Sequence, residues 1–184
     1  MQIAALFLSL LSVAWVQPSN ADTAAALLDH LVGRWAMAGT LGGKQATHDV
    51  TARWVLNKEY VEFHEVSRDR RPDGTPAFEA IVFLAWHART GEFMCLFLDN
   101  TVGGGLSPEG IARGRRSGNA IPVVFACRSG ECPPGLSEHE SIQTTFDYDP
   151  STDSWRLTID NVTDGKASRF GDMKLTRSAR GPIR

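Results

Sequence analysis

The sequence predicts an all-β domain of about ten antiparallel strands behind one short helix, and three observations lead to this fold class. After residue 33, helical periodicity nearly disappears and apolar residues alternate with polar ones. Turn residues interrupt the alternation, as at Gly42-Gly43 and Asp164-Gly165. No helical segment intervenes between the strands, which leaves two architectures, an up-and-down antiparallel β-barrel and a two-sheet sandwich.

The individual elements follow from local patterns along the chain. A helix is predicted over residues 22–32, because Asp22 or Thr23 can cap it and its alanines and leucines favour it. Gly33 can end this helix. Strands are predicted at residues 34–40, 47–56, 60–67, 78–87, 92–99, 111–115, 120–127, 138–147, 154–161 and 168–176. Pro122 indicates an edge position or a bulge for its strand, because proline has no amide hydrogen for the ladder.

The first 21 residues are typical of a secretory signal peptide. Residues 3–16 are an unbroken run of apolar and small residues, shorter than the roughly 20 residues that a transmembrane helix needs. Ser19-Asn20-Ala21 has the small-x-small pattern of a cleavage site, so cleavage is expected after Ala21. The mature chain, residues 22–184, is then a single exported domain, periplasmic or secreted, with no membrane span. An uncleaved N-terminal anchor is the alternative.

Charge and cysteine usage narrow the class further. The formal net charge of −2 argues against a nucleic-acid partner, which would need a basic excess. Cys127 and Cys132 enclose four residues, and export favours a disulfide between them. This spacing differs from that of a Cys-x-x-Cys redox or zinc pair. Cys95 lies within "FMCLFL" and is predicted to be a buried free thiol.

Four segments together resemble the DUF1579 family of lipocalin-like proteins. They are "LVGRWAMAGT" after the short helix, "ARWVLNKEYVEFHEV", "FLAWHARTGEFMCLFLDNTVGGG" and the closing "DMKLTR". The resemblance is closest over residues 28–105, where Asp99, Asn100 and Gly103 stand at an Asp-x-x-Gly-like motif of the family. It implies a calycin-type barrel and therefore favours the barrel over the sandwich.

The resemblance also implies structural roles at the two ends of the domain. Trp35 on the first strand would plug one end of the barrel, and Arg177 on the last strand would lie across it, with Lys174 as the second choice. Stacking of arginine on tryptophan contributes about 0.5–2 kcal/mol. Gly33 would let the chain turn closely beneath the indole.

A barrel of eight to ten strands can hold one small ligand, so the predicted function is binding of a small apolar or amphipathic molecule. Four aromatic residues at alternating positions are predicted to form one inward set, namely Trp54, Phe63, Trp86 and Phe97. Three polar residues are candidates for the mouth or polar end of the pocket, namely His64, Asp99 and Arg53.

The main alternative is a structural or interaction module in which the same aromatic residues fill the core. A pocket needs small residues opposite the aromatic ones, and Ala52, Ala80 and Ala85 favour a cavity for that reason. An enzyme would need at least two titratable groups converging inside the barrel, and the sequence shows no such spacing and no nucleophile motif. No catalytic residue is therefore assigned.

The five histidines have no spacing typical of a metal site, so neither a metal nor another cofactor is expected. Related lipocalin-like proteins of the nitrobindin type bind haem through a histidine near the C-terminus, whereas residues 140–184 of this chain contain none. Haem bound through His64 or His139 is the alternative that this leaves open.

Overall fold

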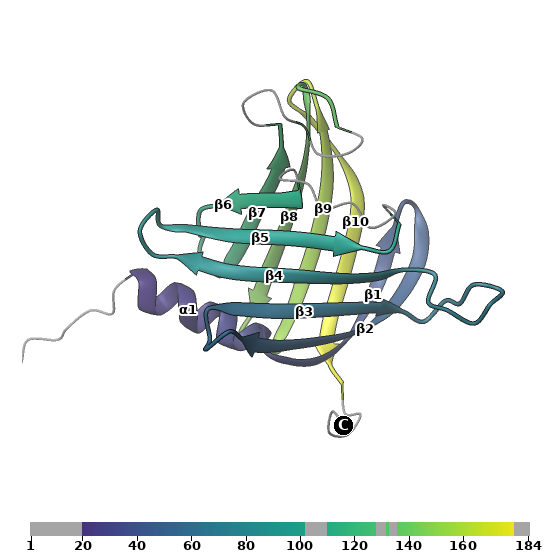
Figure 1. Ribbon diagram of the computed structural model, residues 1–184, viewed down its shortest axis with the longest axis horizontal. Coiled ribbons are helices and arrows are strands. Elements are labelled where there is room, and N and C mark those ends of the chain that lie inside the picture. Colours follow the sequence, from purple (N-terminus) through teal and green to yellow (C-terminus); the bar gives the residue numbers. More distant parts are fainter. Residues whose placement is uncertain (1–19, 102–109, 128–131, 133–135, 179–184) are drawn as a thin grey trace, which may run out of the picture.

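The computed structural model describes residues 20–101, 110–127, 132 and 136–178, which form a closed barrel of ten antiparallel strands with one helix at its end (Figure 1). This confirms the predicted fold class and decides for the barrel over the sandwich. The helix is α1 (Asn20–Leu31). The strands are β1 (Gly33–Leu41), β2 (Lys44–Val55), β3 (Tyr60–Ser67), β4 (Glu79–His87), β5 (Glu92–Asp99), β6 (Ile111–Gly114), β7 (Ala120–Ala126), β8 (Glu140–Asp149), β9 (Ser154–Thr163) and β10 (Lys166–Arg177). Most of the predicted signal peptide, residues 1–19, lies outside the described residues.

Each strand pairs with its neighbours in the chain, and β1 pairs with β10 to close the barrel. The seam between β6 and β7 is the weakest, since its register contains the single pair Arg113 and Val124. Pro122 lies on β7 next to this seam, opposite Thr145 of β8. A residue without an amide hydrogen is tolerated there because the neighbouring ladder is so short.

Because the strands alternate in direction, the connections gather at two ends of the barrel. Helix α1 covers one of them, which we call the closed end, where β1 begins and β10 finishes (Figure 1). Four apolar side chains of α1 are almost fully buried, namely Ala24, Leu27, Leu28 and Leu31. The opposite end, here called the open end, carries the β1–β2, β3–β4, β5–β6, β7–β8 and β9–β10 connections.

Trp35 and Arg177 join the barrel to the last turn of α1. The indole of Trp35 is 1% exposed, and its Nε1 donates a hydrogen bond to the Leu31 carbonyl at 2.8 Å. The Arg177 guanidinium carbon lies 3.8 Å from the centroid of the Trp35 ring, and the guanidinium donates to the carbonyls of His30 and Val32. Carbonyls at a helix C-terminus lack intrahelical partners and favour a nearby cation, so this contact satisfies both needs.

Gly33 is required where the chain enters β1 from the helix. Its φ of +138° is a backbone conformation that residues with a side chain rarely adopt. A Cβ atom at this position would overlap Nη1 of Arg177. A side chain at this position would push the guanidinium of Arg177 out of its present place beside the helix carbonyls.

Further contacts hold α1 in place. Trp54 Nε1 donates to Asp29 Oδ1 at 2.7 Å, and Trp155 Nε1 donates to the His30 carbonyl at 3.3 Å. Asp153 accepts hydrogen bonds from Arg177, which hold the pKa of this carboxyl group below its ordinary value. Three indoles and one guanidinium thus close this end of the barrel.

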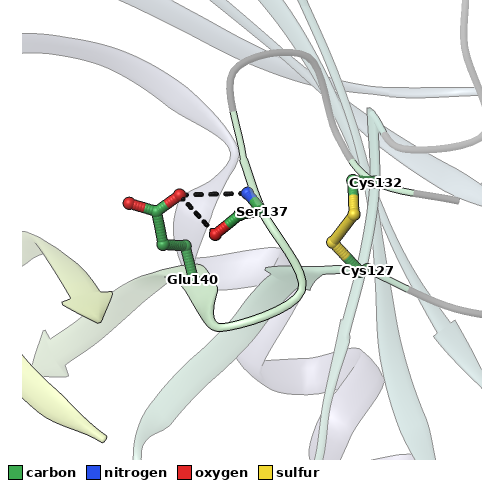
Figure 2. The surroundings of a disulfide bond; sticks show 4 residues. All are labelled: Cys127, Cys132, Ser137 and Glu140. Atoms are coloured by element: carbon green, nitrogen blue, oxygen red, sulfur yellow. Dashed lines mark hydrogen bonds between the residues drawn. A yellow bond between two sulfur atoms is a disulfide. The ribbon is translucent and has the colours of Figure 1, made fainter. Parts of the chain in front are cut away.

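The predicted disulfide between Cys127 and Cys132 is present in the β7–β8 connection at the open end (Figure 2). In the same connection, the backbone amide and hydroxyl of Ser137 donate to Glu140 Oε2 at 3.0 and 2.9 Å (Figure 2). These bonds, the one from the amide first, lower the pKa of Glu140. Cys95 is a buried free thiol, as predicted, and burial raises its pKa to about 12.

These two states of cysteine predict a stepwise thiol titration. At pH 8 the folded protein is expected to show no thiol that reacts with an aromatic disulfide reagent, because Cys95 is buried and protonated. Denaturation without reductant should expose one thiol, and denaturation with reductant all three cysteines. The variant Cys95→Ala should lack the first of these steps. Three thiols in denaturant alone would show that the Cys127–Cys132 bond does not form in solution.

Candidate functional site

The open half of the barrel encloses a cavity of about 700 Å³. Ligand pockets have volumes of about 300–1,000 Å³. The cavity is lined mostly by residues toward the open ends of the strands and extends down to Phe146, Leu157 and Met173, whereas α1 and the side chains around Trp35 fill the closed end. Its entrance therefore lies among the open-end connections, at residues such as Lys44, Asp69 and Asp99.

The wall of the cavity is largely apolar and aromatic. Phe63 and Phe146 meet edge to face with ring centroids 5.7 Å apart, and Phe97 and Phe125 do the same at 6.2 Å. All four rings line the cavity. Such edge-to-face pairs are a favourable arrangement of aromatic side chains and leave ring faces available to an apolar guest.

The four aromatic residues predicted as an inward set do share the inner face, but only two of them line the cavity. Phe63 and Phe97 both lie opposite Val82 in the ladder, and all three line the cavity. Trp54 and Trp86 lie toward the closed end, outside the lining. Trp54 is bonded to α1 there, and the Trp86 ring packs edge to face on a neighbouring phenylalanine at 5.0 Å.

Of the three polar residues predicted at the mouth or polar end of the pocket, only Asp99 lines the cavity. His64 faces outward, 36% of its side chain is exposed, and its Nε2 lies 2.7 Å from Glu79 Oε1. Arg53 also lies outside and pairs with Glu62. Asp99 does line the cavity, at the entrance, where its Oδ1 accepts two hydrogen bonds from Thr101 at 2.6 Å. Asp99 therefore shapes the turn that forms part of the rim.

Two titratable residues on the cavity wall were missed by the sequence interpretation, His48 on β2 and Glu65 on β3. Their residues are 4% and 6% exposed, and His48 Nδ1 is hydrogen-bonded to Glu65 Oε1. Ser67 is buried beside them and accepts a hydrogen bond from the backbone amide of Asp69. Phe78 stacks on the imidazole with ring centroids 5.7 Å apart. The ring is therefore held at one nitrogen and on one face.

A signal for this pair exists in the alternation of the two strands. His48 has the same parity as Val50 and Ala52, which form the apolar face of β2, and Glu65 has the same parity as Phe63. Two titratable residues at apolar-face positions of adjacent strands can meet inside a barrel, although they are far apart in sequence. His48 and Glu65 thus provide the two titratable groups converging inside the barrel that an enzyme would need.

The pair presents hydrogen-bonding atoms to the cavity. An ionised Glu65 carboxylate accepts a hydrogen bond that Nδ1–H of a neutral imidazole donates, which leaves Nε2 of that imidazole as an acceptor. Among the described residues, no group is hydrogen-bonded to Nε2 of His48 or to Oε2 of Glu65. Both side chains line the cavity, so a ligand in it can reach these atoms.

Neither a metal-binding cluster nor a membrane-spanning helix is found in the part of the chain that the structure describes. No cluster of three or more histidine, cysteine, aspartate or glutamate residues there could hold a metal ion. No helix among those residues has the length and apolar character needed to cross a membrane.

The comparisons with known proteins do not place the chain in a family. No family model matches it, and no curated protein matches it. The closed ten-strand barrel is compatible with the lipocalin-like fold that the DUF1579 resemblance implies.

Proposed function

We propose that this protein is an exported, lipocalin-like barrel of the DUF1579 type that binds a small, mainly apolar molecule in the cavity at its open end. The observation that carries the proposal is the cavity itself, about 700 Å³ in volume and walled by aromatic rings. Removing apolar ligand surface from water would drive binding, at about 25 cal/mol per Å² before the costs of association.

Export is supported by two independent features. The N-terminal segment has the apolar core and the cleavage pattern of a signal peptide. The Cys127–Cys132 bond belongs to the mature part, and disulfides persist mainly in oxidising compartments such as the periplasm or the extracellular space.

The cavity weighs against the alternative of a filled core. Ala52, Ala80 and Ala85 do not line it, so they are not the residues that make room. Small side chains on the wall include Ala46 and Ser67 instead. Neither histidine named as a haem ligand lines the cavity, because His64 faces outward and His139 is exposed in the turn before β8. This weighs against the haem alternative.

Filling the cavity should weaken binding of a neutral apolar fluorophore such as N-phenyl-1-naphthylamine. Ala46→Phe adds a ring to the wall of the cavity and is expected to weaken binding about tenfold or more, measured by fluorescence titration. Ala38→Phe makes the same change at an exposed position of β1 and serves as the matched control.

Equal affinities of these two variants would show that the fluorophore binds outside the barrel. No binding to the unmodified protein would contradict the proposed function. Native mass spectrometry of protein purified from an export compartment then reports the mass of any ligand that is retained.

A further inference from the structure

The cavity wall has a marked imbalance of charge. Within the described residues, three carboxylate side chains line it, those of Glu65, Asp69 and Asp99, against the single ammonium group of Lys44. Asp69 and Asp99 lie at the entrance, and Glu65 lies inside. A ligand with a carboxylate head group would meet like charges both on the way in and at the polar part of the wall.

The His48–Glu65 pair lies on the cavity wall near the open end of β3. His48 lies opposite Ser67, the last residue of β3, and Glu65 lies opposite Ala80 of β4, which in turn pairs with Asp99. Both residues of the pair are nevertheless almost fully buried, at 4% and 6% exposure. The rest of the cavity wall is mostly apolar and aromatic. A ligand that fills the cavity would therefore bury whichever group lies against the pair, and a buried polar group must be hydrogen-bonded to avoid a desolvation cost.

The pair itself defines which head group can satisfy it. With a neutral imidazole, Nε2 of His48 and Oε2 of Glu65 are both acceptors, so the ligand must donate. With a protonated imidazole, Nε2–H is a donor and Oε2 is still an acceptor, which a hydroxyl group can match by donating and accepting at once. In both protonation states the complementary head group donates a hydrogen bond and carries no negative charge.

We propose that the His48–Glu65 pair is the head-group site of the cavity, and that it selects amphiphiles whose head donates hydrogen bonds, a hydroxyl or an ammonium group, over fatty-acid-like carboxylates. This inference rests on the proposed function, because it requires a ligand in the cavity. It adds the chemical class of that ligand and the direction in which it lies, with its polar end toward β2 and β3.

The test compares four probes with the same ten-carbon chain, namely 1-decanol, its methyl ether, decylamine and decanoate. Each displaces N-phenyl-1-naphthylamine from the full mature chain in a fluorescence titration. The alcohol or the amine is expected to bind about tenfold or more tightly than both the ether and the carboxylate, because a hydrogen bond to a charged group is lost with either of these. The ether distinguishes donation from mere polarity.

Variants assign the preference to the pair. Glu65→Gln removes the charge and keeps the shape, so discrimination against decanoate should fall about tenfold. The double variant His48→Leu/Glu65→Leu removes the acceptors of both residues and should abolish the advantage of the alcohol over the ether. The matched control is the outward-facing pair, in which His64→Phe and Glu79→Gln should leave all four affinities unchanged.

The outcomes separate this inference from the proposed function. If the fluorophore binds and decanoate competes as well as decanol, the head-group assignment is wrong while the binding function stands. If the preference is present but His64→Phe abolishes it as fully as the inner double variant does, the assignment to the inner pair is also wrong. If neither the fluorophore nor any of the probes binds, the proposed function itself fails.

Discussion

Replacing Trp35 by alanine is expected to lower the free energy of unfolding by about 3–5 kcal/mol, the range for buried tryptophan. The indole is almost completely buried, so its removal leaves a large void at the closed end. The change also removes the hydrogen bond to Leu31 and the ring on which Arg177 lies. Urea unfolding followed by far-UV circular dichroism measures the effect. A loss below about 1 kcal/mol, the typical effect of one mutation, would show that Trp35 does not close the barrel.

Trp86 provides the matched control for the hydrogen bond. Its Nε1 is buried and, among the described residues, has no hydrogen-bond partner, in contrast to Nε1 of Trp35. The substitutions Trp35→Phe and Trp86→Phe remove the same atoms from two rings, of which the first is fully buried and the second partly buried. Only the first leaves a buried carbonyl without its donor, so we expect it to cost about 1–3 kcal/mol more than the second. Equal losses would show that the bond to Leu31 adds nothing to the packing.

The strands were predictable from the sequence because alternation records which residues share a face. The main differences are at strand ends, where β2 begins at Lys44 rather than at residue 47. The inner face of Phe63 and Phe97 also follows from alternation. Alternation contains no information on height along the barrel axis, however. The sequence therefore could not separate the aromatic residues that line the cavity from Trp54 and Trp86, which lie where α1 fills the barrel.

The polar part of the site was missed for a different reason. Phe63 and His64 are adjacent, and neighbours on a regular strand face opposite sides. Both could meet one ligand only at a bulge, and the β2–β3 ladder is regular at these positions. The inward histidine is His48. No local sequence pattern indicates its role, because its partner Glu65 is seventeen residues away. Only the pairing of β2 with β3 brings them together.

Separating the partners of this pair is expected to be strongly destabilising. His48→Leu leaves the buried Glu65 carboxylate without its hydrogen bond, and Glu65→Leu leaves Nδ1 of His48 without an acceptor. Leaving a buried donor or acceptor unsatisfied typically costs about 1–3 kcal/mol, and more for a charged group, so we expect a loss of at least that size for the first variant. Urea unfolding of both single variants provides the measurement.

The double variant His48→Leu/Glu65→Leu decides why the chain keeps the pair. Replacing both partners by apolar residues of similar size is often neutral or stabilising by about 1–4 kcal/mol, because no buried polar group is left unsatisfied. We therefore expect the double variant to unfold at a urea concentration equal to or above that of the unmodified protein, while it no longer prefers decanol to its methyl ether. A pair that costs stability and confers head-group preference is retained for binding. If the losses of the two single variants instead add in the double variant, the pair is part of the architecture, and the polar wall of the cavity has a structural origin.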